Sequence, residues 1–205
     1  NISFDKRYLL KVIPGADIQS CKPIYNYLLH FRDRLEQRWE PENGKIKWYE
    51  LRPCVYYSKF EEPKIIYPDI SSEGGFYWDE EGYFFNNTIY MISGNIKKSW
   101  VGLLNSKLIS WYYKQIASGL GEKGTRYFTQ FMEQLPIIED TDSLDTLTQK
   151  MIDLNKQLNS IERNSNKWNE IKSEIEKTDK KIDEEVYKLY GLTPEEIKIV
   201  EENIK

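Results

Sequence analysis

Lys64-Ile65-Ile66-Tyr67 is a short run of β-branched and aromatic side chains that directly follows the turn-forming segment Phe60-Glu61-Glu62-Pro63. Such a run is typical of a β-strand. Residues 55–57 and 83–92 are also rich in Tyr, Val and Ile. A loop at residues 71–75 separates the run at residues 64–67 from the run at residues 83–92. Helical patterns flank these runs without a regular βαβ alternation, so the sequence predicts an α+β fold with a small mixed or antiparallel sheet.

Two helices are expected beside these strands, over residues 23–39 and 99–116. In the first, apolar side chains recur at spacings near 3.6, at Ile24, Tyr27, Leu28, Phe31, Leu35 and Trp39. In the second, one broad face carries Trp100, Leu103, Leu104, Lys107, Leu108, Trp111 and Tyr112. We therefore expect Trp100, Trp111 and Tyr112 to belong to the core.

The composition changes near residue 140. Residues 1–140 contain 18 basic and 18 acidic side chains, whereas residues 141–205 contain 11 and 15 and so carry the whole net charge of −4. The later part has two long apolar stripes around a polar turn at residues 163–166, which predicts an antiparallel helical hairpin. Thr193-Pro194-Glu195-Glu196 then predicts a last short helix. The sequence thus suggests two structural units, one over residues 1–140 and a helical-hairpin spacer with a short helix over residues 141–205.

The composition restricts the class of protein. The chain of 205 residues has two cysteines and one histidine, so neither a disulfide framework nor a zinc site is expected. No apolar run approaches the roughly 20 residues that span a bilayer, and the first residues lack the layout of a signal peptide. We expect a cytoplasmic protein without membrane association. The first residue is not Met, which suggests a piece of a longer protein.

One basic segment stands out in this acidic chain. Residues 93–128 contain six Lys or Arg and one acid, interleaved with Trp and Tyr, and the segment includes a glycine-rich loop. Such a segment is either the solvated face of a helix with its loop or a footprint for a polyanion. A loop can enter a DNA groove where a packed helix cannot. The candidate contacts are therefore Lys123, Thr125, Arg126 and Tyr127, with Lys114 at the end of the helix. Arg126 could donate to guanine or clamp a phosphate, and the sequence does not separate these roles.

Further basic residues outside this segment are weaker candidates. Lys59 and Lys64 flank the Phe-Glu-Glu-Pro turn and could touch DNA, or could be ordinary turn charges paired with Glu61 and Glu62. Lys47 lies beside Trp48 and Tyr49, together with Lys45 and Arg52, and could form a second contact loop.

Other polar residues have competing roles. Asn86 and Asn87 could read adenine, although a β-turn explains adjacent asparagines better. Pro68-Asp69 resembles the start of a nuclease metal site. In such a site an acid-x-Lys triplet follows close by on a strand, but here the nearby triplet comes before Pro68-Asp69. Three acids at residues 79–81 could bind a divalent cation or lie at a hairpin tip. We expect no metal site and no catalytic residue in this chain.

Several segments together resemble one family. They are Gly15-Ala16-Asp17-Ile18, Tyr56-Tyr57-Ser58-Lys59-Phe60-Glu61-Glu62-Pro63-Lys64-Ile65-Ile66-Tyr67, Asn86-Asn87-Thr88-Ile89-Tyr90-Met91-Ile92, Leu103-Leu104-Asn105-Ser106-Lys107-Leu108-Ile109, Gln134-Leu135-Pro136-Ile137 and the tail at residues 182–196. In this order they are similar to the TaqI-like C-terminal specificity domain. That domain is the DNA target recognition part of adenine-specific methyltransferases and of fused restriction–modification enzymes.

The resemblance implies that residues 1–140 are a sequence-specific DNA target recognition domain. This domain would direct a covalently linked N6-adenine methyltransferase, with or without a fused endonuclease. The methyltransferase half should carry an Asn-Pro-Pro-Tyr-type motif and a glycine-rich loop for S-adenosylmethionine. Neither occurs in this sequence. The cofactor is therefore expected in that other half, and the partners of this chain are double-stranded DNA and the linked methyltransferase.

Two functions of other classes are alternatives. Aromatic side chains also stack on sugars, so the chain could be a glycan-binding module. It could also be a structural domain whose hairpin mediates assembly. The salt dependence of binding distinguishes a DNA-binding domain from a glycan-binding module, because affinity for DNA falls steeply with ionic strength and affinity for sugar hardly changes.

Overall fold

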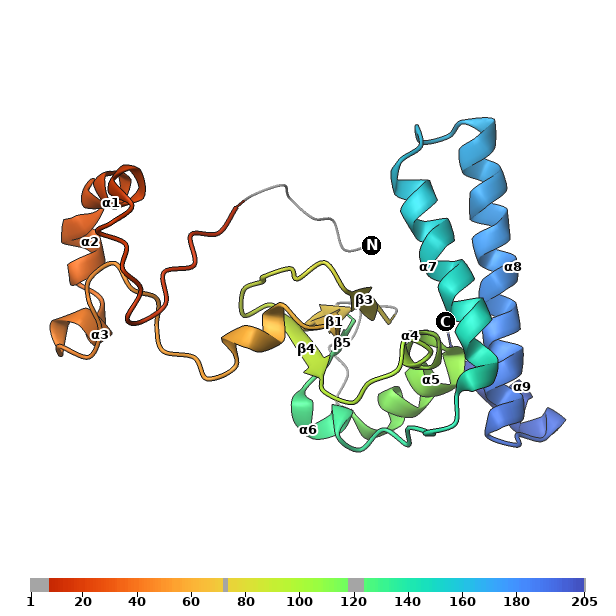
Figure 1. Cartoon of the computed structure of the whole chain (residues 1–205). Helices are drawn as coiled ribbons and strands as arrows, with labels where there is room; N and C mark the ends of the chain where they lie inside the picture. Colours follow the sequence, from red (N-terminus) through yellow and green to blue (C-terminus); the bar gives the residue numbers. More distant parts are fainter. Residues whose placement is uncertain (1–7, 72–73, 118–123, 205) are drawn as a thin grey trace. The chain divides into compact units, whose positions relative to one another are not determined.

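The computed structural model describes residues 8–71, 74–117 and 124–204 (Figure 1). Contacts within the chain define two compact units, whose described residues are 8–58 and 59–204. The helices that follow residue 140 belong to the second unit, together with the sheet. The predicted division near residue 140 does not coincide with the boundary between these units, and it stays a prediction about the roles of the two parts.

The first unit contains three short helices, α1 (Lys22–Leu29), α2 (Arg32–Glu36) and α3 (Trp39–Glu42). The single helix predicted over residues 23–39 is therefore wrong in its continuity. The backbone of Phe31 leaves the helical region at φ −111° and ψ 8°, and Arg38 is extended. The helical spacing of the apolar side chains holds within each short helix, but it does not show the breaks between the helices.

The small core of the first unit is stabilised by one buried polar side chain, that of Glu50. Val12, Ile18 and Tyr49 form the apolar centre. The buried carboxylate of Glu50 accepts hydrogen bonds from two backbone amides, of Gly15 at 2.9 Å and of Lys47 at 2.8 Å. The bond from Gly15 joins two segments of the unit that are 35 positions apart in the sequence, and the bond from Lys47 is local.

An antiparallel sheet opens the second unit. It has the order β3-β1-β4, with β1 (Lys64–Pro68) between β3 (Tyr77–Asp79) and β4 (Ile89–Ser93). Ile65 pairs with Trp78 on one side and with Ile92 on the other. Since β1 is central, its first four residues are all buried, which explains the apolar run that follows Lys64, Ile65-Ile66-Tyr67.

The strand predictions were partly right. Residues 64–67 form a strand as predicted, and the run at 83–92 is a strand only from Ile89. Residues 55–57 are not a strand, because the chain turns there into the 3₁₀ helix Tyr57–Phe60. A two-stranded ribbon of β2 (Ile70–Ser71) and β5 (Thr125–Arg126) was not predicted.

The helix predicted over residues 99–116 is two helices, α4 (Trp100–Asn105) and α5 (Lys107–Ile116). Ser106 separates them in an extended conformation, at φ −65° and ψ 156°. Its buried hydroxyl donates to the carbonyl of Leu103 at 2.7 Å and accepts from the amide of Ile109 at 3.4 Å. Ser106 thus ends one helix and caps the next.

The C-terminal hairpin was predicted correctly. It consists of α7 (Asp145–Asn159) and α8 (Asn166–Leu189), which run side by side in opposite directions (Figure 1). The short helix α9 (Pro194–Asn203) follows, and Gly191 precedes it with φ at +65°. The capping box predicted at Thr193 and Glu196 is present. These features depend on local sequence signals, which accounts for the success.

The core of the second unit joins the sheet to the hairpin through α4 and α5. Leu103 and Leu104 are almost fully buried and belong to one cluster with Ile65 of β1 and Val186 of α8. Trp100, Trp111 and Tyr112 pack against this cluster, as expected. The predicted α+β fold is confirmed.

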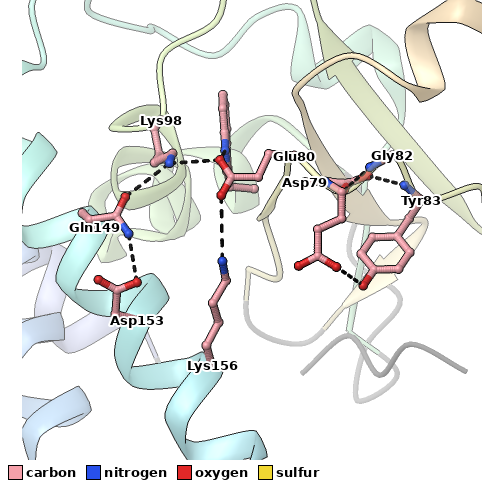
Figure 2. A network of polar contacts seen from close by, with 10 residues as sticks. Asp79, Glu80, Gly82, Tyr83, Lys98, Gln149, Asp153 and Lys156 are labelled. Carbon is pink, nitrogen blue, oxygen red and sulfur yellow. Dashed lines mark hydrogen bonds and ion pairs between the residues drawn. The ribbon is translucent and has the colours of Figure 1, made fainter. Parts of the chain in front are cut away.

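A polar network also connects the sheet to α7 (Figure 2). Glu80 follows β3 directly and lies 3.2 Å from the ammonium of Lys98 and 3.9 Å from that of Lys156. Lys98 also donates to Gln149 of α7 at 3.2 Å. These side chains are largely exposed, so the network fixes orientation more than it adds stability.

Candidate nucleic-acid interface

The candidate interface lies at the β2–β5 ribbon and the turn at residues 86–88. Ile70 pairs with Arg126 across the ribbon. Asp69, just before β2, donates its backbone amide to the carbonyl of Thr88 at 2.8 Å and accepts from the amide of Tyr127 at 2.8 Å. These bonds bring together three segments that are far apart in the sequence, in one small surface region.

Arg126 and Asp69 form a two-point ion pair in this region. The Nε of Arg126 lies 3.0 Å from Oδ1 of Asp69, and its Nη2 lies 2.9 Å from Oδ2. The hydrogen bonds from Arg126 lower the pKa of Asp69, so the carboxylate stays ionised. The guanidinium carbon also lies 5.1 Å from the ring centre of Phe128, which is exposed. Arg126 is therefore held in one place while 43% of its side chain faces solvent.

The neighbouring turn contains the two predicted asparagines. The side-chain oxygen of Asn86 accepts from the amide of Thr88 at 3.1 Å and from its hydroxyl at 2.6 Å. The turn role expected of Asn86 is confirmed by these bonds. Asn87 is exposed at the same turn.

The predicted contacts around Arg126 are not all at the surface. Lys123 lies outside the described residues. Thr125 is buried, and Tyr127 belongs to the core, where its ring stacks on that of Tyr113 at 4.7 Å between centres. Burial raises the pKa of Tyr127 to about 12. This burial corrects the prediction for Thr125 and Tyr127, since neither side chain is presented to a ligand.

The predicted lysines of the second unit occupy three environments. Lys64 is fully buried and paired with Asp79, so its burial removes it from the predicted set of DNA contacts. Lys59 is half-exposed and pairs with Glu62 at 2.7 Å, as the turn-charge alternative described. Lys114 is exposed on the last turn of α5. Lys59 and Lys114 therefore remain accessible to a phosphate.

Lys47 belongs to the first unit. Its side chain is exposed, and its ammonium lies 5.7 Å from the ring centre of Tyr49. Lys45 lies over the exposed ring of Trp39 at 4.1 Å. The loop around Trp48 therefore lies within the first unit, and its contact with DNA stays a prediction.

The acids considered for a nuclease or a cation site have protein partners. Asp69 is bound to Arg126, and Asp79 accepts from three backbone amides in addition to Lys64. Among the described residues no group of three or more His, Cys, Asp or Glu side chains could hold a metal ion. None of the described helices is long and apolar enough to cross a membrane.

The sequence did not predict two members of this region. Asp69 lies 57 positions before Arg126, and no spacing rule connects residues so far apart in the sequence. Phe128 was seen only as the end of the aromatic basic segment. The opposite charges of Asp69 and Arg126 could have suggested an ion pair only once β2 and β5 were known to be neighbours.

Comparisons with known proteins agree with this fold. A family model described as the TaqI-like C-terminal specificity domain matches residues 10–137. The Type II methyltransferase M.BanIII of Aneurinibacillus aneurinilyticus is 27% identical over 157 residues, which are 73% of this chain and 27% of that protein.

A solved structure is also similar. It is that of the Type IIL restriction–modification enzyme MmeI in complex with DNA, with a TM-score of 0.53 and 17% identity over 87% of this chain and 25% of that one. The chain thus spans about a quarter of the length of each of these two proteins.

Proposed function

The chain belongs to the family of TaqI-like C-terminal specificity domains, and from that premise we propose that it recognises the DNA target of a linked N6-adenine methyltransferase. A fused endonuclease would share the same recognition domain. The observation that carries the proposal is the family match, because it covers both the sheet with its ribbon and most of the first unit.

The division of labour follows from the length of the relatives. The relative M.BanIII is named as a methyltransferase, and this chain spans only 27% of it. The sequence here has no Asn-Pro-Pro-Tyr motif. We propose that S-adenosylmethionine binding and methyl transfer belong to the rest of the polypeptide, and that this chain is itself catalytically silent and cytoplasmic.

In the proposed mechanism, the exposed side chains divide between two tasks. Lys59 and Lys114 would fix the register of the domain on phosphates, which carry no sequence information. The region around Arg126 would read base edges in the major groove. The methyltransferase would then turn the target adenine out of the stack.

Salt dependence tests whether the chain binds DNA. The polypeptide that carries this chain is titrated into a labelled duplex pool by fluorescence anisotropy between about 50 and 200 mM salt. The logarithm of the association constant should fall linearly with the logarithm of the salt concentration. Lys114→Gln should make this slope shallower by about one phosphate contact. Lys177→Gln is the matched control, since Lys177 is exposed on the hairpin helix α8. An affinity that does not change with salt would favour the glycan-binding alternative.

A second measurement tests the link to adenine methylation. In the full-length polypeptide, transfer of the labelled methyl group of S-adenosylmethionine to a duplex is followed, and the product base is identified. We expect N6-methyladenine, and we expect Arg126→Ala to slow transfer to the specific duplex while S-adenosylmethionine binding is unchanged. A methylated cytosine as the product would exclude the adenine-specific role.

A further inference from the structure

The ion pair between Arg126 and Asp69 uses only one edge of the guanidinium group. Arginine has five N–H groups in a planar fork. Nε and one hydrogen of Nη2 are directed to the carboxylate. Within the part of the chain that the structure describes, no hydrogen bond of Nη1 accompanies these. The outer edge, which consists of Nη1 and the second hydrogen of Nη2, thus retains a pair of parallel donors.

This outer edge is fixed in direction. Asp69 is 16% exposed, and its backbone is bonded on both sides to Thr88 and Tyr127. The ring of Phe128 lies against the guanidinium group, and the backbone carbonyl of Arg126 accepts from the hydroxyl of Tyr113 at 2.8 Å. A flexible side chain loses rotamer entropy when it binds a ligand, and here much of that loss has occurred on folding.

The charge of the pair indicates what this edge can bind. The carboxylate of Asp69 neutralises the guanidinium, so the pair attracts a phosphate weakly, and a phosphate beside Asp69 would meet a like charge. A base edge is uncharged and requires donors in the correct geometry. Two parallel donors match the N7 and O6 acceptors of guanine, which lie side by side in the major groove.

We propose that Asp69 is a positioning residue, which orients Arg126 to donate its outer two N–H groups to N7 and O6 of one guanine in the DNA target. The proposal rests on the proposed function of the chain. It also separates the two roles of Arg126 that the sequence left open, in favour of base reading. One well-made pair of this kind discriminates against a wrong base by about tenfold to a hundredfold.

The test begins with selection of bound sequences from a random duplex pool by the full-length polypeptide. Wild type, Asp69→Asn and Arg126→Ala are compared, with Glu174→Gln as the matched control. Glu174 is also an acid paired with a cation, but its partner Lys150 lies on the helical hairpin. We expect Asp69→Asn and Arg126→Ala to lose the preference for guanine at the same single position, by about tenfold or more, while other positions and Glu174→Gln stay as in wild type.

Modified bases test the contact without changing the protein. At that position, 7-deazaguanine lacks the N7 acceptor and should weaken binding of wild type but hardly affect Arg126→Ala. Hypoxanthine keeps N7 and O6 and should bind as guanine does. Equal weakening on all sequences, with a smaller salt slope for Arg126→Ala, would show a phosphate contact and overturn the proposal, as would an unchanged motif in both variants. If wild type selects no sequence, the proposed function itself fails and this inference fails with it.

Discussion

The ammonium group of Lys64 is paired with the carboxylate of Asp79 directly across β1 and β3, and neither side chain is exposed to solvent. Asp79 also accepts from the backbone amides of Glu81, Gly82 and Tyr83, at 2.9, 3.2 and 3.0 Å (Figure 2). Lys64 donates in addition to the carbonyl of Phe60. The pair therefore joins two strands and the turns that flank them, and its charges are fully compensated.

Lys64→Met should strongly destabilise the second unit. The methionine fills a similar volume but leaves the carboxylate of Asp79 buried without its counter-ion, which costs about 3–5 kcal/mol. Urea unfolding followed by tryptophan fluorescence measures the change, since Trp78 lies beside Asp79 on β3.

Lys59→Met is the control for this substitution. Lys59 pairs with Glu62, and both side chains are 40% or more exposed. Exposed pairs contribute about 0–1 kcal/mol, so the unfolding midpoint should hardly move. Equal effects of the two substitutions would mean that burial of the Lys64 pair is not what stabilises the sheet.

Gly102→Ala should destabilise the contact between α4 and α7. A methyl group on Gly102 would overlap the hydroxyl oxygen of Thr148, whose side chain is buried on α7. Overpacking of this kind costs about 1–3 kcal/mol, of which the better helix propensity of alanine offsets up to about 1 kcal/mol. The net loss is expected as a lower midpoint of thermal unfolding.

The double variant Gly102→Ala/Thr148→Ala tests that mechanism. Without the hydroxyl, the nearest atoms to the new methyl group are Cβ of residue 148 at 3.6 Å and Cγ2 of Ile182 at 3.7 Å, which are ordinary contacts. The hydroxyl of Thr148 has no hydrogen-bond partner among the described residues, so its removal is tolerated. The double variant should recover most of the stability, and no recovery would refute steric overlap as the cause.

The success of the sequence-based predictions depended on the distance over which each signal acts. The hairpin and the capping box at Thr193 were predicted because their signals lie within a few residues. The break at Ser106 was missed, although serine is a preferred cap, because the apolar stripe continues across it. The apolar stripe indicates that both helices face the same core, but it does not indicate that the chain changes direction between them.

The candidate site was only partly predictable for the same reason. Arg126 was identified from local charge, and its accessible position agrees with that. Tyr127 is the next residue, and its ring points into the core because side chains alternate along an extended segment. The burial of Lys64 required knowledge that β3 places Asp79 opposite to it. Whether a charged side chain on a strand is buried thus depends on which strand pairs with it, and this pairing cannot be read from a single sequence.

Thr193→Ala should lower the stability of α9. The hydroxyl of Thr193 accepts from the amide of Glu196 at 3.3 Å, and the carboxylate of Glu196 accepts from the amide of Thr193 at 2.8 Å. Loss of an N-cap costs about 1 kcal/mol. Hydrogen exchange should show the first amides of α9 less protected. Thr193→Ser keeps the cap and should behave as wild type, whereas equal protection in the alanine variant would mean that the cap is dispensable.

Asp183 should make stability fall as pH rises above about 4. Its side chain is buried on α8, and this burial raises its pKa, although the hydrogen bond from the backbone amide of Lys107 at 2.8 Å and the Lys107 ammonium at 3.4 Å oppose the shift. A carboxyl group whose pKa is higher in the folded state binds more protons there than in the unfolded state. The resulting stability is present below the ordinary carboxyl pKa and is lost as pH rises through the raised one.

Asp183→Asn removes this titration. The free energy of unfolding of the variant relative to wild type should therefore increase between pH 4 and pH 7, while the other carboxylates cancel in the comparison. Glu184→Gln, at an exposed position of the same helix, should give a nearly constant difference over that range. Urea midpoints at half-unit pH steps provide the measurement. If Asp183→Asn loses stability relative to wild type as the pH rises, attraction to Lys107 outweighs burial and the pKa of Asp183 is lowered in the folded chain.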